Sequence, residues 1–263
     1  MSIFDLTGKV ALVTGAGRGI GRGIAEELAS QGATIACASR TTEQLEEVAK
    51  SIRDSGGKAI SFPLDISEMA SLDETLARID SEFGRLDILV NNAGMNARQP
   101  IDEVTEENYD RIMDVNLKGL YFLSQKAARY MKRNGAGKII NISSLTTGYA
   151  LAKVSVYTAT KGAVGQLTKA QAVEFGEHNI QVNAICPGFV VTSLTEKMWA
   201  NPTMREWGES RVALGKLATP KDMAGTAAFL AASASDYVTG QCIYVDGGFM
   251  AGDRWPLPEA AAS

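Results

Sequence analysis

Short apolar runs alternate with longer segments of helical periodicity along almost the whole chain. The apolar runs predict strands at Val10–Thr14, Thr34–Ser39, Ala59–Leu64, Ile88–Val90, Lys138–Ile142, Gln181–Ile185 and Cys242–Val245. The segments between them predict helices, among them Gly21–Gln31, Thr42–Ser55, Ser67–Phe83, Glu106–Lys132, Tyr157–Glu177 and Pro220–Ala232. This alternation predicts βαβ units and therefore a parallel sheet with helices on both faces. Most of the predicted strands are apolar on both sides, as a doubly covered sheet requires.

The length of the chain and its lack of linkers favour a single domain. A chain of 263 residues fits one large domain better than two, and residues 1–263 contain no internal repeat, low-complexity tract or linker rich in proline and serine. A domain of this size buries enough surface to fold without disulfides. Residues 253–263 include two prolines followed by alanines, and we expect them to form a loose tail.

The charge and the start of the chain exclude several classes of partner. The formal net charge is −4, so the electrostatics do not favour nucleic acid or an anionic membrane. The first residues lack the basic and apolar regions of a secretory signal, and no apolar stretch reaches the length of a membrane helix, about 18 residues. Cys37, Cys186 and Cys242 stand in or beside apolar runs, and we interpret them as small buried side chains in a reducing compartment. We therefore expect a cytoplasmic protein.

A glycine-rich loop follows the first predicted strand. Gly15, Gly19 and Gly21 allow the backbone to approach a pyrophosphate closely, and the helix beyond them supplies free N–H groups and a positive dipole end. Glycines also make plain strand–helix turns, so the loop alone is weak evidence. Its place at the first turn of a βαβ pattern makes dinucleotide binding the favoured interpretation.

The spacing of this loop, Gly-x-x-x-Gly-x-Gly in the segment TGAGRGIG, resembles the short-chain dehydrogenase/reductase family. The resemblance extends in family order from residue 7 to residue 248, through Asp65-Ile66, Asn91-Asn-Ala-Gly94, Asn116, Asn141-Ile-Ser-Ser144, Tyr157-x-x-x-Lys161, Pro187-Gly188 and Thr192. It implies an α/β fold of the Rossmann type, a doubly wound sheet of seven parallel strands in a single domain. It also implies a homotetramer or homodimer.

The end of the second predicted strand indicates which nicotinamide cofactor is bound. Enzymes that prefer NAD usually carry an acidic residue there, whereas this strand ends in Ser39 and Arg40 without a carboxylate. Arg18 of the glycine loop can reach the same ribose, and two guanidinium groups suit a 2′-phosphate. We therefore expect NADP(H), with NAD less favoured. The alternative is that Arg40 is a solvated loop charge and Arg18 an ordinary loop residue.

Tyr157 and Lys161 are the candidate catalytic pair. They are four positions apart on a predicted helix, so both project from one face. A nearby ammonium, together with oxidised nicotinamide, is expected to bring the pKa of the phenol toward the working range, which makes Tyr157 a general acid and base. Ser144 ends a strand at the ligand side of the sheet and can hold the substrate oxygen; its alternative role is that of a turn residue.

The family resemblance assigns further roles. It implies that the carboxamide or backbone of Asn116 holds a water that completes a proton relay with Lys161; the alternative is a solvated helix position. It implies adenine contacts at Asp65 and Ile66, and contacts at Asn91 that hold the adenine-side ribose and the central strand. The remaining predicted cofactor residues are Ile20, Ala93, Gly94, Pro187, Gly188, Val190 and Thr192.

The substrate side is less clearly marked in the sequence. Residues 190–217 form the longest stretch without strand character, and we interpret them as a lid, the alternative being surface helices packed on the domain. The candidate substrate residues are Asn96, Arg98, Leu145, Thr146, Met198 and Trp199. Arg98 can pair with a substrate carboxylate or be a solvated arginine.

We expect no metal site and no Ser-His-Asp hydrolase, because His178 is the single histidine and falls near a predicted helix end. Segments 198–202 and 237–248 resemble bacterial family members that act on sugars and sugar acids, such as gluconate 5-dehydrogenase-like proteins. The expected reaction moves a hydride between NADP(H) and a secondary alcohol or ketone, or a sugar hemiacetal or lactone. The alternatives are a 3-oxoacyl carrier-protein reductase or other small-ketone reductase, and an NADPH-binding regulatory protein without turnover.

Overall fold

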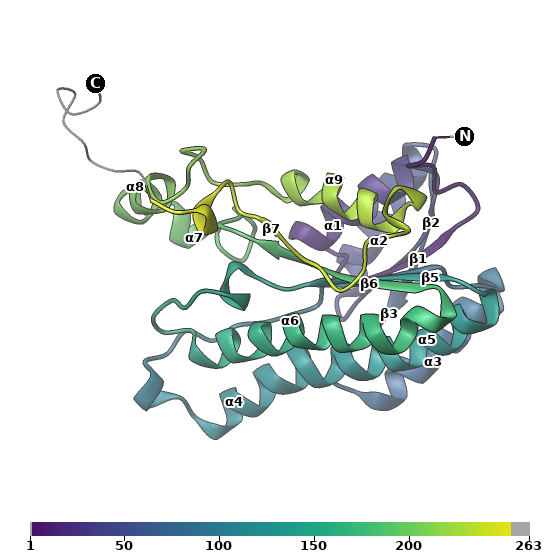
Figure 1. Cartoon of the computed structure of the whole chain (residues 1–263), viewed down its shortest axis with the longest axis horizontal. Coiled ribbons are helices and arrows are strands. Elements are labelled where there is room, and N and C mark those ends of the chain that lie inside the picture. The colour runs from purple at the N-terminus through teal and green to yellow at the C-terminus, as the bar shows by residue number, and fades with distance from the viewer. Residues whose placement is uncertain (1, 254–263) are drawn as a thin grey trace.

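The computed structural model describes residues 2–253 and contains one sheet of seven parallel strands in the order β3-β2-β1-β4-β5-β6-β7 (Figure 1). The strands are β1 (Val10–Thr14), β2 (Thr34–Ser39), β3 (Lys58–Pro63), β4 (Ile88–Asn91), β5 (Gly137–Ile142), β6 (Ile180–Pro187) and β7 (Cys242–Val245). This confirms the predicted doubly wound α/β sheet, with strand ends within two residues of the sequence pattern. The predicted tail lies, from residue 254 on, outside the described residues.

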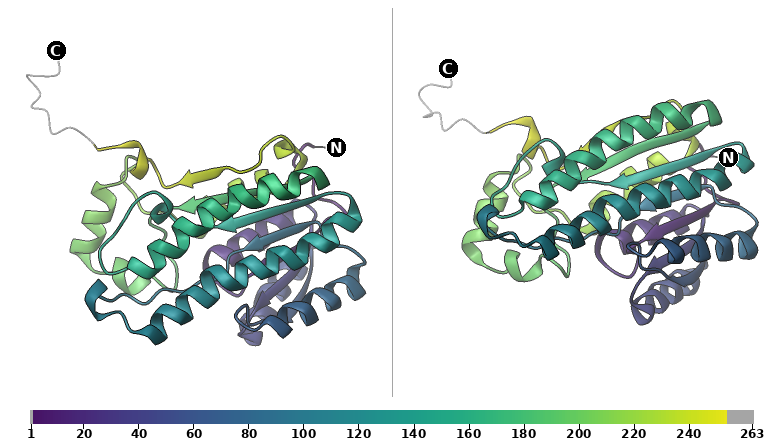
Figure 2. Two further views of the ribbon diagram at one scale, coloured as in Figure 1. Left: turned by 60° about the horizontal axis from the view of Figure 1, so that its bottom comes forward. Right: turned by 90° about the horizontal axis from the view of Figure 1, so that it is seen from below.

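Helices cover both faces of the sheet, as the views in Figures 1 and 2 show. One face is covered by α1 (Gly19–Ser30), α2 (Thr42–Asp54) and α9 (Pro220–Ala231). The other is covered by α3 (Met69–Phe83), α5 (Leu120–Asn134) and α6 (Ser155–Phe175). Two separate apolar clusters fill the two layers, which explains why the central strands are apolar on both sides.

The predicted helix Glu106–Lys132 is helical throughout, but its middle is π-helical. It consists of α4 (Glu106–Met113), a π-helical turn over Asp114–Gly119, and α5. A side chain at Gly119 would overlap the carbonyl oxygen of Ile66, so the chain passes the sheet closely at this turn. The helix predicted to start at Ser67 starts at Met69, because the Ser67 hydroxyl donates to Asp65 instead of capping the helix.

Two short helices, α7 (Glu196–Trp199) and α8 (Pro202–Ser210), interrupt the stretch that was predicted as a lid. A bridge joins the two ends of this stretch: Val191 N–H donates to Ala218 O and Ala218 N–H donates to Phe189 O, at 2.8 and 2.9 Å. A third apolar cluster, which includes Phe189, Trp199 and Phe249, lies beneath the two helices. No helix within residues 2–253 combines the length and apolarity needed to cross a membrane.

The strand order fixes where a ligand can bind. The chain leaves β1 toward β2 and β3 on one side, and then returns to place β4 on the other side of β1. Ligands of such sheets bind at this switch point, outside the carboxyl ends of the strands.

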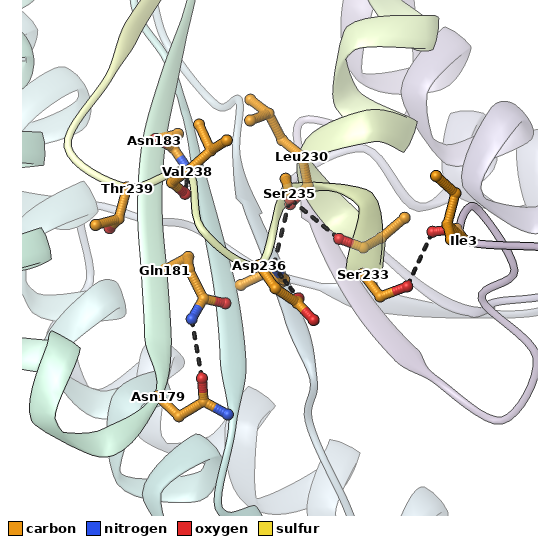
Figure 3. Close-up of polar contacts among 12 residues, drawn as sticks. Ile3, Asn179, Gln181, Asn183, Leu230, Ser233, Ser235, Asp236, Val238 and Thr239 are labelled. Atoms are coloured by element: carbon orange, nitrogen blue, oxygen red, sulfur yellow. Dashed lines mark hydrogen bonds and ion pairs between the residues drawn. The ribbon is translucent and has the colours of Figure 1, made fainter.

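Polar contacts hold the other end of the sheet, where the strands β1 and β4 begin. The buried Asp87 carboxylate accepts from Val10 N–H at 2.9 Å and from two nitrogens of Arg85 at 2.7 and 2.6 Å. In the nearby connection from α9 to β7, Asn183 donates to Val238 O, Ser235 donates to Leu230 O, and Ser233 donates to Ile3 O (Figure 3). These bonds attach the start of the chain and β7 to the sheet, far from the switch point.

Replacing Asp87 with asparagine tests this role. We expect Asp87→Asn to lower the free energy of unfolding by about 2 kcal/mol, because Arg85 loses its partner while the buried acceptor of Val10 N–H is weakened. Asp54→Asn, at an exposed helix pair with Lys50, is the matched control and should change it by less than about 0.5 kcal/mol. Urea unfolding of both variants makes the measurement, and equal effects would contradict the assignment.

Candidate active site

A cavity of about 270 Å³ lies at the carboxyl ends of β1 and β2. Its lining includes these predicted cofactor residues: Gly15, Arg18, Gly19, Ile20, Ser39, Arg40, Asp65, Ile66, Ala93, Gly94 and Thr192. Residues that the sequence reasoning missed also line it: Gly17, Thr41, Gln44, Met95, Val115, Ser193 and Leu194 among them. The structure therefore brings together residues from the glycine loop, the ends of β2 and β4, and the lid stretch.

The glycine loop is shaped by backbone conformations that favour glycine. Gly15 and Gly19 have φ angles of 64° and 57°. A Cβ at Gly21 would overlap the carbonyl oxygen of Gly15, so this glycine permits the helix to pack against the loop and does not itself line the cavity. The first turn of α1 begins here without a side-chain cap, which leaves its N–H groups for an anion. This loop fits the pyrophosphate of a dinucleotide.

Two guanidinium groups, from Arg18 and Arg40, lie along this cavity beside Ser39 and Gln44. Arg40 Nη1 is 3.9 Å from Asp65 Oδ2, the carboxylate of the lining. Burial raises the pKa of Asp65, but the hydrogen bonds from Ser67 and the charge of Arg40 outweigh it and lower the pKa. The donors fit a phosphate on the ribose, because Arg40 is largely exposed and its pairing with Asp65 is long.

A second, larger cavity of about 770 Å³ adjoins the first and shares Ile20, Asn92, Gly94, Met95 and Thr192 with it. Of the four residues predicted to be catalytic, Ser144, Tyr157 and Lys161 line it, whereas Asn116 lines neither cavity. Ser144 follows β5, and its hydroxyl is close enough to the Tyr157 phenol to act on the pKa of Tyr157 in the lowering direction. Lys161 Nζ lies 5.5 Å from the centre of the Tyr157 ring and donates to Ile142 O at 2.7 Å. The predicted helix face thus points at the strand end that carries Ser144.

Burial dominates the ionisation of this pair. It lowers the pKa of Lys161 from 10.5 to about 8. It raises the pKa of Tyr157, while the Ser144 hydroxyl and the charge of Arg98 act in the lowering direction. In the protein alone, desolvation of the phenolate exceeds the favourable contacts. The lowered phenol pKa expected beside oxidised nicotinamide stays a prediction.

Asn116 lies in the π-helical turn and is completely buried, which excludes a solvated helix position. Its carboxamide accepts from Met95 N–H at 2.8 Å and donates to Met95 O and Thr160 Oγ1 at 2.9 and 3.3 Å. Thr160 in turn donates to Tyr157 O at 2.7 Å. The side chain therefore joins the loop after β4 to the helix that carries the catalytic pair, and the predicted water relay stays a prediction.

Asn91 and Asn92 project to different sides of the sheet, and the predicted backbone contact of Asn91 with the ribose stays a prediction. The Asn91 side chain donates to Ser124 and Asn141 inside the layer of α5 and α6, and Asn91 lines neither cavity. Asn92 lines both cavities and donates to Thr14 O and Gly15 O at 2.9 and 3.3 Å. The alternation of a strand explains this, because neighbouring residues project to opposite faces.

All the predicted substrate residues line the second cavity: Asn96, Arg98, Leu145, Thr146, Met198 and Trp199. Pro187, Gly188 and Val190, predicted at the cofactor, line it as well. The stretch predicted as a lid packs on the domain through α7 and α8 and also lines the cavity, and its closure over a substrate stays a prediction. Trp199 is buried against Phe189, with ring centres 5.3 Å apart, yet it also forms part of the cavity wall with Met204 and Trp207.

The polar groups of this wall have a distinct character. Arg98, Lys153 and Lys161 line the cavity, and no carboxylate of residues 2–253 does. Within residues 2–253 three buried polar atoms of the lining lack a hydrogen-bond partner: Asn96 Oδ1, Thr146 Oγ1 and Trp199 Nε1. A ligand rich in hydroxyl groups and carrying negative charge matches these features.

Metal ligands are not gathered in the part of the chain described here, where no group of three or more His, Cys, Asp or Glu side chains could hold an ion. His178 lies 3.3 Å from Glu177 Oε1, away from both cavities. Cys37 and Cys186 are buried and Cys242 is half-buried, in line with the predicted apolar role. The sequence did not show that Cys186 and Cys242 are neighbours across β6 and β7.

Comparisons with known proteins agree with this geometry. A family model described as enoyl-(acyl carrier protein) reductase matches residues 15–250. The gluconate 5-dehydrogenase of Gluconobacter oxydans is 37% identical over 246 residues, which cover 94% of this chain and 96% of that protein.

Two solved structures are similar over nearly their whole length. A gluconate 5-dehydrogenase from Burkholderia cenocepacia, in complex with NADP and tartrate, has a TM-score of 0.91 at 37% identity and covers 95% of this chain and 98% of that one. A short-chain type dehydrogenase/reductase from Mycobacterium marinum has a TM-score of 0.90 at 37% identity, with the same coverage.

The buried ammonium of Lys161 predicts a pH-dependent stability. A lysine whose pKa falls from 10.5 to about 8 on folding destabilises the native state below pH 8, and this penalty fades as the pH rises toward 10.5. The free energy of unfolding of the parent should therefore rise relative to that of Lys161→Met by about 2–3 kcal/mol between pH 7 and pH 10. Urea unfolding across this range measures the difference, and a difference that does not change with pH would refute the burial effect.

Proposed function

The chain belongs to the short-chain dehydrogenase/reductase family, and we propose that it is an NADP(H)-dependent oxidoreductase that interconverts a secondary alcohol and a ketone on a small sugar acid. The observation that carries this proposal is that Ser144, Tyr157 and Lys161 line a cavity continuous with the glycine-loop cavity. A substrate bound there has its reacting oxygen beside a phenol and a hydroxyl, next to a site suited to a dinucleotide.

Each of the three side chains has a distinct task. A bound nicotinamide supplies or accepts the hydride. The Ser144 hydroxyl donates to the substrate oxygen and holds it against Tyr157. Tyr157 delivers the proton to that oxygen during reduction and removes it during oxidation. Lys161 places a positive charge 5.5 Å from the phenol ring, which favours the phenolate when the proton leaves.

The NADP(H) assignment is supported by Arg18, Arg40 and Ser39 along the first cavity. It is also supported by the related Burkholderia enzyme, which carries NADP. The remaining proposed cofactor contacts are Gly15, Gly19, Ile20, Asp65, Ile66, Ala93, Gly94, Pro187, Gly188, Val190 and Thr192.

The sugar-acid assignment is supported by the charge of the second cavity, which has cationic side chains and, among the described residues, no carboxylate in its lining. Arg98 has no carboxylate within ion-pair distance in residues 2–253, and its charge reaches the Tyr157 phenol. We assign it to the substrate carboxylate. The unpaired Asn96 Oδ1, Thr146 Oγ1 and Trp199 Nε1 are suited to hydroxyl groups. The Gluconobacter relative, named for gluconate, is in keeping with this class.

The proposal includes a homotetramer or homodimer in the cytoplasm, as the family resemblance implies, acting on a free small molecule. A 3-oxoacyl carrier-protein reductase is the runner-up within the family. Such a reductase needs a basic docking surface for an acidic carrier protein, in addition to the cavity. A regulatory NADPH-binding protein without turnover is disfavoured by the complete set of Ser144, Tyr157 and Lys161.

A reductase assay tests the function. Loss of NADPH absorbance is followed with 5-keto-D-gluconate, with D-fructose as the neutral ketose of equal carbon number, and with a 3-oxoacyl thioester. We expect turnover with the keto acid and at least a thousandfold loss of kcat in Tyr157→Phe. Arg98→Gln should raise the KM for the keto acid about tenfold and leave that for fructose within twofold. Preference for the thioester, or a Tyr157→Phe variant as fast as the parent, would overturn the proposal.

The cofactor preference has its own test. Arg40→Ala should raise the KM for NADPH at least tenfold and leave the KM for NADH within twofold, because only the 2′-phosphate needs the guanidinium. Steady-state kinetics with either cofactor at saturating substrate give both values. A KM for NADPH equal to that of the parent would contradict the role of Arg40.

A further inference from the structure

Lys161 is attached to the end of β5 at two points. Its Nζ donates to Ile142 O at 2.7 Å, and its main-chain carbonyl accepts from the next residue, Ser143 Oγ, at 3.0 Å. Both Lys161 and Ser143 are buried. Because Ser144 follows directly, these two bonds fix the distance between the lysine turn of α6 and the strand end that carries the substrate-holding hydroxyl.

The Ser143 bond is the end of a longer chain of hydroxyl and thiol groups. Thr147 Oγ1 lies 2.6 Å from Ser143 Oγ and 3.3 Å from Lys161 O. The Cys186 thiol of β6 donates to Thr147 Oγ1 at 3.6 Å. A hydrogen bond with Cys242 and burial raise the pKa of Cys186, so this thiol stays protonated and remains a donor. The chain therefore runs from β6 through Thr147 and Ser143 to the carbonyl of Lys161.

We propose that Thr147 is a positioning residue, which orients Ser143 onto the Lys161 carbonyl and so holds Lys161 and Tyr157 in register with Ser144. This inference rests on the proposed function, since it concerns how the same catalytic pair is held.

Helix geometry does not require this contact. A carbonyl in the middle of a helix already accepts the N–H four residues further on, so the two hydroxyls are additional partners of Lys161 O. The two hydroxyls instead fix the position of this helical turn relative to the strand. A displacement of about 1 Å at a catalytic group is enough to slow a reaction about a hundredfold.

The orientation of Thr147 is set by a neighbouring glycine. A Cβ at Gly165 of α6 would lie 2.5 Å from Thr147 Cγ2, so the threonine methyl occupies the space that a larger residue would take. With the methyl packed against the helix, the hydroxyl is directed to Ser143 and Lys161. The two halves of this side chain can therefore be tested separately.

The experiment compares Thr147→Val, which keeps the shape and loses the hydroxyl, with Thr147→Ser, which keeps the hydroxyl and loses the methyl. Thr158→Val is the matched control, because Thr158 Oγ1 of α6 is buried without a partner in residues 2–253. We expect Thr147→Val to lower kcat about tenfold, the effect of one lost hydrogen bond, and to leave the KM for NADPH within twofold. Thr147→Ser and Thr158→Val should keep kcat within about twofold.

The pH profile of kcat separates positioning from a general loss of structure. In Thr147→Val, Lys161 is held less firmly and gains contact with water, which raises its pKa. The pH at which kcat is half-maximal should therefore rise in Thr147→Val and stay constant in Thr158→Val. The groups that face Lys161 are Tyr157 on its own helix, Cys186 on β6, and Arg98 and Lys153 in the same cavity. Thr147→Val removes the acceptor of the Cys186 thiol, but the hydrogen bond with Cys242 and burial still raise the pKa of Cys186.

Each outcome has a defined meaning. A Thr147→Val variant with the parent's kcat and pH profile overturns the inference, as does a Thr147→Ser variant that is as impaired as the valine variant. Tyr157→Phe is measured in the same assay. If it is inactive while Thr147→Val equals the parent, only this inference fails; if it is as active as the parent, the proposed function fails first. Urea unfolding of each variant shows that the protein assayed is folded.

Discussion

The site depends on one buried ammonium, that of Lys161, held against the carbonyl of Ile142 without a carboxylate partner. A buried charge of this kind is costly, and proteins tolerate it where the charge is used. Its surroundings are rigid: the π-helical turn with Asn116 holds one side of α6, and the hydroxyls after β5 hold the other. The unfavourable burial of Lys161 and the raised pKa of Tyr157 have a common origin in the closed space between the sheet and α6.

Much of this arrangement follows from local sequence features. The apolar runs predicted all seven strands because a sheet covered on both faces needs side chains without polarity on both sides of each strand. The glycine loop and the four-residue spacing of Tyr157 and Lys161 are likewise local, so their positions could be read from the chain. The family resemblance supplied the rest of the predicted cofactor contacts, most of which line the two cavities.

What could not be predicted depends on contacts between distant segments. The role of Asn92 rather than Asn91 follows from which face of β4 each residue occupies, and two adjacent asparagines give no sequence signal for that. The chain of Thr147, Ser143 and Cys186 joins β5, β6 and α6, so no periodicity could reveal it. The burial that raises the pKa of Tyr157 in the protein alone could not be predicted, because burial is a property of the assembled core and not of the pair. Gln44 and Lys153 could have been suspected only from their place near the ends of β2 and β5.

The bridge between Val190 and Ala218, which joins the two ends of this stretch, has a consequence for divergence. Its two ends lie close together at the sheet, so insertions or exchanges within it alter the entropy of closure only slightly. The wall that contacts the outer part of the ligand can therefore vary over evolutionary time while the proton-transfer groups, which stand on the sheet and on α6, remain as they are. One scaffold can in this way serve many related molecules with the same chemistry.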